Sequence, residues 1–220
     1  MRRILLFLFL LSSMTIVKAQ QELLVPSQNY KRYNSELVKA LIPEETKQFW
    51  LLKKPSMSLY QDESLVFQYQ TMKLTLRKTR CPKENEPPIV IDKYELRLNK
   101  EQADAIYSLF TAAVYSSSLL ADAQILDGVT YTFGAFPDAA EIIPYYKGSN
   151  GYHLTEIADM LCECVQTNDL ERINDNLKEI KDLTDKFVAH YPCKPSETSA
   201  IRFHHSSYQV KGKSMGLDFQ

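Results

Sequence analysis

The stretch YELRLNKEQADAIYSLFTAAVYSSSLLADAQILDGVTYTFGAF, residues 94–136, decides the fold because it predicts a strand, a long helix and a second strand in succession. Tyr94, Leu96 and Leu98 alternate with charged residues, which is the period of two expected of a strand with one buried face. Asn99 and Gln102 have the spacing of a capping box, in which each side chain bonds a backbone amide at the start of a helix. The chain is therefore expected to pass from a strand directly into a helix.

This helix is expected to run from Asn99 to about Ala121, with its inward residues three and four positions apart on one face. The face comprises Ala103, Ile106, Tyr107, Phe110, Ala113, Val114 and Ser117. Asp127-Gly128 then predicts a turn, because glycine tolerates positive φ without steric cost. After the turn, alternation with threonines predicts a second strand containing Val129, Tyr131 and Phe133.

The rest of the predicted sheet flanks this stretch. Leu65 to Thr79 favours strand, and its inward face slips by one residue near Thr71, which indicates a β-bulge or a break between two strands. Cys81 to Pro88 is expected to be a loop, because its prolines cannot donate to a ladder. Ile89 to Leu98 is predicted to return antiparallel to the preceding strand, and Ala139 to Tyr146 to pair with the strand after the turn.

Helical patterns lie on both sides of the sheet region. Upstream, Pro43 fits the first turn of a helix that ends before Pro55 and contains the apolar cluster Phe49, Trp50 and Leu52. Downstream, two apolar stripes predict a helix hairpin that ends before Pro192. The first stripe is Leu154, Ile157, Ala158, Leu161 and Val165. The second runs from Leu170 to Val188, after a capping box at Asn168 and Glu171.

Together these patterns predict a single-domain α+β protein, with an antiparallel sheet of four or five strands packed by three main helices. A length of 220 residues is sufficient for one sizeable core. We divide the chain into a signal peptide at residues 1–19, an N-terminal helical segment at 20–64, an α+β core at 65–193 and a polar C-terminal tail at 194–220.

The first nineteen residues have the pattern of a cleavable secretory signal. Arg2 and Arg3 form its basic end, Ile4 to Ile16 its apolar run and Val17-Lys18-Ala19 a small-residue cleavage site before Gln20. The run is too short and too polar for a membrane anchor, so we expect a periplasmic or secreted protein without a transmembrane segment in the mature chain. Removing three of the 26 basic residues and no acidic one leaves 23 against 27, which gives no electrostatic reason to expect nucleic acid as a partner.

Four cysteines follow the signal and are candidates for disulfide bonds in an exported protein: Cys81, Cys162, Cys164 and Cys193. Four cysteines allow three complete pairings, and the sequence does not choose among them. Cys162 and Cys164 lie two residues apart in a predicted helix, so they point to opposite flanks and are not expected to bond each other. A bond from Cys193 to either of them, or burial of the thiols, is favoured over a zinc site that also uses His190.

The sequence contains no nucleophile elbow, Walker loop, Rossmann fingerprint or H-E-x-x-H motif. Ser116 to Ser118 lie in the predicted central helix, and His204-His205 lie in the polar tail, where neighbouring side chains on a strand would point to opposite faces. We therefore assign no catalytic residue, no metal ligand and no cofactor. The enzymatic alternative is an envelope hydrolase whose site is assembled from distant residues.

Tyrosines are abundant, thirteen in all, and three of them flank a loop that contains glycine: Tyr145, Tyr146 and Tyr152. A tyrosine combines a large apolar face with a polar tip, which suits contacts with proteins or glycans. We interpret these three as a candidate interaction surface. The competing interpretation is that their rings cover the sheet edge and the start of the following helix.

The run from Tyr94 to Phe133, with Pro144, the GSN at Gly148 to Asn150 and the following helix pair, resembles uncharacterised exported proteins of gut Bacteroidetes. The resemblance covers Tyr94 to Val188 and implies a small α+β fold, a domain of unknown function, with no catalytic residue to carry over. We therefore expect a non-enzymatic binding or interaction module of the cell envelope, with a protein or glycan partner.

Overall fold

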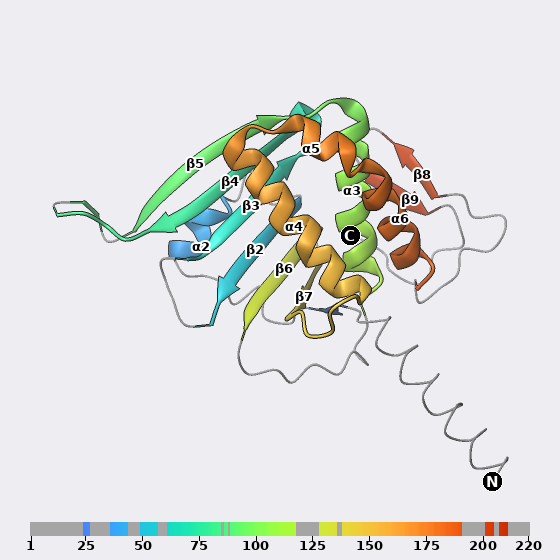
Figure 1. Cartoon of the computed structure of the whole chain (residues 1–220), viewed down its shortest axis with the longest axis horizontal. Helices are drawn as coiled ribbons and strands as arrows, with labels where there is room; N and C mark the ends of the chain where they lie inside the picture. Colours follow the sequence, from blue (N-terminus) through green and yellow to red (C-terminus); the bar gives the residue numbers. More distant parts are fainter. Residues whose placement is uncertain are drawn as a thin grey trace, which may run out of the picture.

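The structure is a computed structural model that describes residues 24–26, 36–43, 49–56, 61–84, 86–87, 89–117, 128–135, 138–190, 201–204 and 207–210. Its main feature is one antiparallel sheet of seven strands in the order β1-β7-β6-β2-β3-β4-β5 (Figure 1). The strands are β1 (Val25–Pro26), β2 (Phe49–Pro55), β3 (Glu63–Gln68), β4 (Lys73–Arg80), β5 (Val90–Arg97), β6 (Val129–Ala135) and β7 (Asp138–Ile142). Because β1 has only two residues, six strands form most of the sheet.

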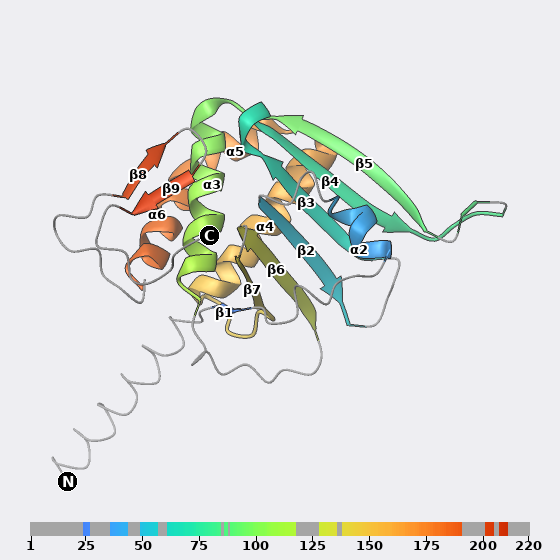
Figure 2. The ribbon, with the colours of Figure 1, turned by 180° about the vertical axis from the view of Figure 1, so that it is seen from behind.

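Helices cover both faces of this sheet, and Figures 1 and 2 show the two sides. One side carries α3 (Lys100–Tyr115), α4 (Asn150–Thr167), α5 (Leu170–Asp175) and α6 (Leu177–Val188), while the short α2 (Glu36–Leu41) lies on the other. A separate hairpin pairs β8 (Ile201–His204) with β9 (Ser207–Val210). The predicted α+β class with an antiparallel sheet is confirmed, and the sheet is larger than the four or five strands expected.

The main core lies between the sheet and the larger group of helices. Aromatic rings join α3 to the strands: Phe49 on β2 contacts Tyr107 with 4.5 Å between ring centroids, and Phe110 contacts Phe133 on β6 at 5.3 Å. Both pairs meet edge to face, which is a favoured geometry for aromatic rings. The predicted inward face of the central helix is therefore confirmed from Ala103 to Val114, because these residues supply the α3 side of this core. The predicted helix end near Ala121 is wrong, because α3 ends at Tyr115 and Ser117 lies beyond it.

The predicted helix through Phe49, Trp50 and Leu52 is wrong, because this segment is β2, the middle strand of the sheet. Phe49 and Leu51 enter the main core, whereas Trp50 and Leu52 enter a second core beneath α2. A strand buried on both faces reads as an unbroken apolar run without alternation, so its sequence does not distinguish it from a buried helix. The described part of residues 20–64 thus holds one helix, α2, but also β1, β2 and the start of β3.

The strand expectations around β3 and β4 are confirmed. The slip near Thr71 is a break between two strands, formed by a 3₁₀ turn at Tyr69–Thr71 and by Met72 with a positive φ of 50°. β4 and β5 then pair antiparallel, as do β6 and β7. The last pair confirms the partner strand predicted from Ala139, although β7 ends at Ile142.

Helix ends explain where the chain turns. The capping box of α3 is present, with Gln102 N donating to Asn99 Oδ1 and Asn99 N donating to Gln102 Oε1, both at 2.9 Å. The capping box predicted at Asn168 is wrong by one residue: Asn168 ends α4 in a left-handed conformation, and the side chain of Asp169 caps α5. The predicted second helix of the hairpin is also divided in two at Asn176.

Candidate functional site

Two of the three predicted tyrosines form an exposed pair on the loop between β7 and α4. Tyr145 is 63% exposed and Tyr146 is 50% exposed, and their rings meet edge to face with 4.7 Å between centroids. Tyr152, in the first turn of α4, is partly buried. The structure therefore brings Tyr145 and Tyr146 together at the surface, outside the core. It leaves the side chain of Tyr152 only partly accessible.

Short-range hydrogen bonds hold the loop that carries this pair. Ser149 N donates to Tyr146 O at 3.0 Å, and the hydroxyl of Ser149 accepts from Tyr152 N at 3.0 Å as the N-cap of α4. Gly148 lies between them with a φ of 89°, a conformation that favours glycine. The tyrosine pair is thus anchored directly to the start of a long helix.

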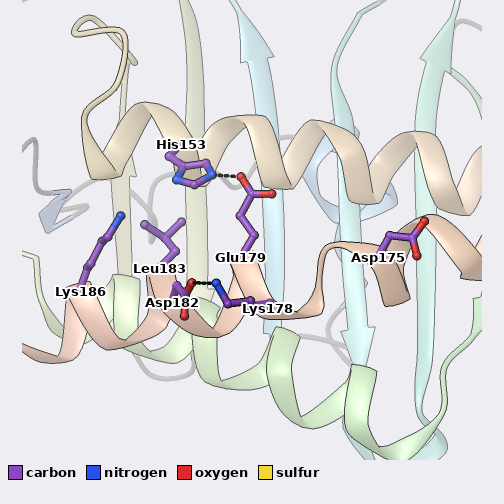
Figure 3. A pocket seen from close by; sticks show the side chains of 7 residues that line it. All are labelled: His153, Asp175, Lys178, Glu179, Asp182, Leu183 and Lys186. Carbon is purple, nitrogen blue, oxygen red and sulfur yellow. Dashed lines mark hydrogen bonds and ion pairs between the residues drawn. The ribbon is translucent and has the colours of Figure 1, made fainter.

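A pocket opens between α4 and α6 (Figure 3), and its lining includes His153, the residue that follows Tyr152. Its lining residues are His153, Asp175, Lys178, Glu179, Asp182, Leu183 and Lys186. His153 Nε2 hydrogen-bonds to Glu179 Oε1, and Lys178 forms an ion pair with Asp182 at 3.3 Å. Sequence reasoning missed this pocket, because its charged residues occupy exposed helix positions that normally indicate a solvated face.

The chemistry available in the pocket is that of charge recognition. A histidine oriented by a carboxylate is part of a nucleophilic triad, but a triad also needs a hydroxyl or a thiol. None of the seven lining residues is Ser, Thr or Cys. The pocket offers ammonium groups, carboxylates and an imidazole to a polar ligand.

A second polar cluster lies between the sheet and α4. Lys53 on β2 contacts Asp159 of α4 at 2.9 Å and Glu63 of β3 at 3.2 Å. The hydroxyl of Tyr131 on β6 donates to Asp159 Oδ2 at 2.9 Å. Glu63 Oε2 is buried and lacks a hydrogen bond of good geometry, but the ammonium of Lys78 lies 3.1 Å away. These five residues, which we call the α4 clamp, tie the helix to four strands.

Burial and charge shift the titration of this clamp. Burial alone would lower the pKa of Lys53, but its hydrogen bond to Asp159 and the charge of Glu63 outweigh burial and raise it. The pKa of Tyr131 is raised by burial and then by the charge of Asp159. Shifted groups often indicate catalysis, yet here each pairs with another member of the clamp. The arrangement is that of a structural ion-pair network.

The cysteines occupy different surroundings, as their spacing predicts. Cys162 is buried next to the α4 clamp, and burial followed by the charge of Glu63 raises the pKa of its thiol. Cys164 is buried on another flank, with its Sγ 3.5 Å from Met160 Sδ. No disulfide joins these two or the exposed Cys81, and Cys193 lies outside the described residues.

The remaining predicted sites are only partly within the described chain. Within the described residues, no cluster of three or more His, Cys, Asp or Glu residues is arranged to hold a metal ion. Of the alternative zinc set, Cys162, Cys164 and His190 are described and Cys193 is not. The backbone of His204 belongs to β8, while His205 falls outside the description, as does the signal at residues 1–19. None of the described helices is long and apolar enough to cross a membrane.

No protein-family model, no curated protein and no solved structure matches this chain. The features of the described chain that bear on its function are the two surfaces above, the tyrosine pair and the charged pocket.

Proposed function

We propose that this chain is an exported cell-envelope protein that binds a protein or glycan partner through Tyr145 and Tyr146. The observation that carries the proposal is the exposure of these two adjoining rings on a loop fixed to the N-terminus of α4. Exposed aromatic rings gain most when a partner covers them, and a rigid loop reduces the entropy lost on binding. Export rests on the signal pattern at residues 1–19.

The pocket between α4 and α6 supports the same proposal. It starts at His153, next to Tyr152, so the loop and the pocket share the first turn of α4. An aromatic pair beside charged groups resembles the general make-up of interfaces, in which aromatic anchors are accompanied by a polar rim. We therefore assign the tyrosine pair as the anchor and the charged pocket as a polar part of the same binding surface.

The test is a binding measurement on isolated envelopes and on a glycan array. The mature chain from Gln20 is expected to bind in a saturable manner, and the double variant Tyr145→Ala/Tyr146→Ala to bind at least about tenfold more weakly. Leu170→Ala is the matched control, because it removes an exposed apolar side chain at the start of α5, beyond the other end of α4. Equal binding by the double variant and the wild type would contradict the proposal.

The alternative, an envelope hydrolase, has one observation in its favour, the hydrogen bond between His153 and Glu179 in the pocket. Such an enzyme would use His153 as a general base. It predicts turnover of ester, amide or glycoside substrates that disappears in His153→Gln. Binding that persists in His153→Gln without any turnover supports the non-enzymatic proposal.

A further inference from the structure

The two edges of the main sheet differ in how well they are closed. One edge is β1, which has two residues and includes Pro26, a residue without an amide donor. The other edge is β5, with eight residues, and among the described strands it pairs only with β4. Figure 2 shows β5 as the outermost strand of the sheet. A long open edge presents a row of backbone donors and acceptors to another strand.

The pairing of β4 fixes which residues of β5 present those groups. Leu98 N donates to Met72 O at 2.8 Å, so the even-numbered residues at this end of the ladder bond toward β4. Thr79 N donates to Asp62 O at 2.9 Å, so the odd-numbered residues of β4 bond toward β3 and its even-numbered ones toward β5. Both observations indicate that the even-numbered residues of β4 and β5 bond each other. Because bonding direction alternates along an antiparallel strand, the odd-numbered residues of β5 direct their backbone groups away from β4.

The outward backbone groups therefore belong to four odd-numbered residues of β5: Ile91, Lys93, Glu95 and Arg97. The side chain of Lys93 is 52% exposed and that of Glu95 is 40% exposed. Lys93 forms an ion pair with Glu95 of its own strand at 2.6 Å, and it also lies directly opposite Arg77 of β4, a cross-strand pair of like charge. A second carboxylate on the outer side of Lys93 would further offset this repulsion.

Charge and bonding phase together select one register for two copies of β5 paired antiparallel. The two-fold axis must lie between the same residue of the two copies. An axis halfway between successive residues would place an odd-numbered residue, whose backbone groups point outward, opposite an even-numbered one, whose groups bond to β4. An axis at Lys93 or at Glu95 would set that residue against itself. An axis at Tyr94 instead places Lys93 of each copy opposite Glu95 of the other.

Other positions of the axis are less favourable. An axis at Leu96 would also pair opposite charges, Glu95 with Arg97, but β5 ends at Arg97 and the ladder would continue only one residue beyond the axis. An axis at Asp92 would set that carboxylate against itself. The register centred on Tyr94 keeps Ile91 to Arg97 in the ladder and puts all four outward residues into hydrogen-bonded pairs.

We propose that a second copy of this chain docks on β5, with the two strands antiparallel and the two-fold axis at Tyr94. Lys93 and Glu95 select the register by pairing crosswise, and unlike partners are rejected by the alternating charges. The result is one continuous sheet across the dimer. The surface is independent of Tyr145 and Tyr146, so a failure of the tyrosine proposal leaves this one unaffected.

Sedimentation equilibrium on the mature chain tests the dimer. The wild type is expected to dimerise with a Kd between about 1 µM and 1 mM, as befits one strand pair. Lys93→Glu and Glu95→Lys should each weaken the dimer at least about tenfold, because each places like charges opposite each other twice. Tyr145→Ala/Tyr146→Ala is the control and should dimerise like the wild type.

Mixing the two charge variants separates pairing from folding. In an equimolar mixture, Lys93→Glu supplies two acidic positions and Glu95→Lys two basic ones, so a heterodimer as tight as the wild-type dimer should form. The double variant Lys93→Glu/Glu95→Lys should also regain the homodimer. A wild type that stays monomeric up to about 1 mM would overturn the proposal. So would a dimer that neither single substitution weakens, or two weakened variants that do not associate when mixed.

Discussion

At the scale of single residues, Gly134 and Trp50 show how closely the second core is packed. The two residues are directly opposite each other on β6 and β2. A Cβ on Gly134 would overlap the indole ring of Trp50, approaching its Cε2 atom most closely. Gly134 is thus required for close approach of a side chain, which is one of the usual reasons for glycine inside a strand.

We predict that Gly134→Ala lowers the free energy of unfolding by about 1–3 kcal/mol, because the added methyl forces Trp50 out of its place. The measurement is urea denaturation followed by circular dichroism. Introducing the same change in a Trp50→Leu background should cost less, since the overlapping ring is gone. An equal cost in both backgrounds would show that the indole is not the cause.

The α4 clamp allows a second prediction at this scale. Lys53→Met should lower the free energy of unfolding by about 1–3 kcal/mol, because it leaves Glu63, only 12% exposed, without one of its cations. Lys100→Met is the matched control, since its ion pair with Asp104 is exposed and should contribute little to stability. Equal losses in urea melts of the two variants would contradict the structural role of the clamp.

The clamp also has a defined pH dependence. The pKa of Lys53 is raised in the folded chain, so its contribution is fully present below the unfolded lysine value of about 10.4. It is lost as pH rises through the folded value. Lys53→Met should therefore lose most of its disadvantage relative to the wild type in strongly alkaline solution.

At the scale of elements, Gln102 joins two helices as well as capping one. Its Oε1 accepts from Asn99 N, while its Nε2 donates to Asn174 Oδ1 of α5 at 2.8 Å and to Leu170 O at 3.2 Å. Glutamate normally replaces glutamine in a capping box without loss. Here a carboxylate would lack the donors and would face two acceptor oxygens.

Gln102→Glu is therefore predicted to lower the free energy of unfolding by about 1–3 kcal/mol, because it buries a charge at a position that is 1% exposed and removes the two hydrogen bonds to α5. The comparison is Asn99→Ala, which removes only the cap and should cost about 1 kcal/mol. Chemical denaturation of both variants decides the matter. If Gln102→Glu is as stable as the wild type, the bonds to α5 contribute nothing.

The loop between β4 and β5 supplies a pH-dependent element. Both guanidinium nitrogens at the tip of Arg80 bond the carboxylate of Glu86, at 2.6 and 2.7 Å, and Lys83 N donates to it at 2.8 Å. The bonds from Arg80, and then the one from the Lys83 amide, lower the pKa of Glu86 to about 2. These bonds persist above the ordinary glutamate pKa and are lost as pH falls toward 2.

NMR titration of the Glu86 carboxyl is expected to give this low pKa in the wild type. Arg80→Gln should return it toward about 4.3. Arg80→Lys should give an intermediate value, because lysine keeps the charge but cannot form the two parallel bonds. A wild-type pKa near the ordinary value would contradict the observed loop geometry.

At the scale of the whole molecule, the elements with an amphipathic pattern could be predicted from sequence. α3, its capping box and the β4–β5 pair follow from periods of 3.6 and 2, because each buries one face. β2 could not be predicted, since α2 and α3 bury both its faces and remove the alternation. The sheet order, with β2 placed between β3 and β6, depends on contacts between distant segments that no local pattern reports.

The same distinction between local patterns and distant contacts applies to the candidate site. Tyr145 and Tyr146 could be found because a glycine-containing loop with two adjoining aromatic residues is a local signal. The pocket on α4 and α6 could not, since His153 and Glu179 come together only through the packing of the two helices. The α4 clamp was missed for the same reason, as its members come from four strands and a helix.

The most direct test of the tyrosine surface is photocrosslinking in cells that export the chain. A photoreactive phenylalanine derivative at position 146 replaces one exposed aromatic ring by another, and the same derivative at position 170, the start of α5, is the control. We predict a discrete crosslinked envelope partner from position 146 and none from position 170. Full export without any adduct from position 146, or the same adducts from both positions, would contradict the proposed binding surface.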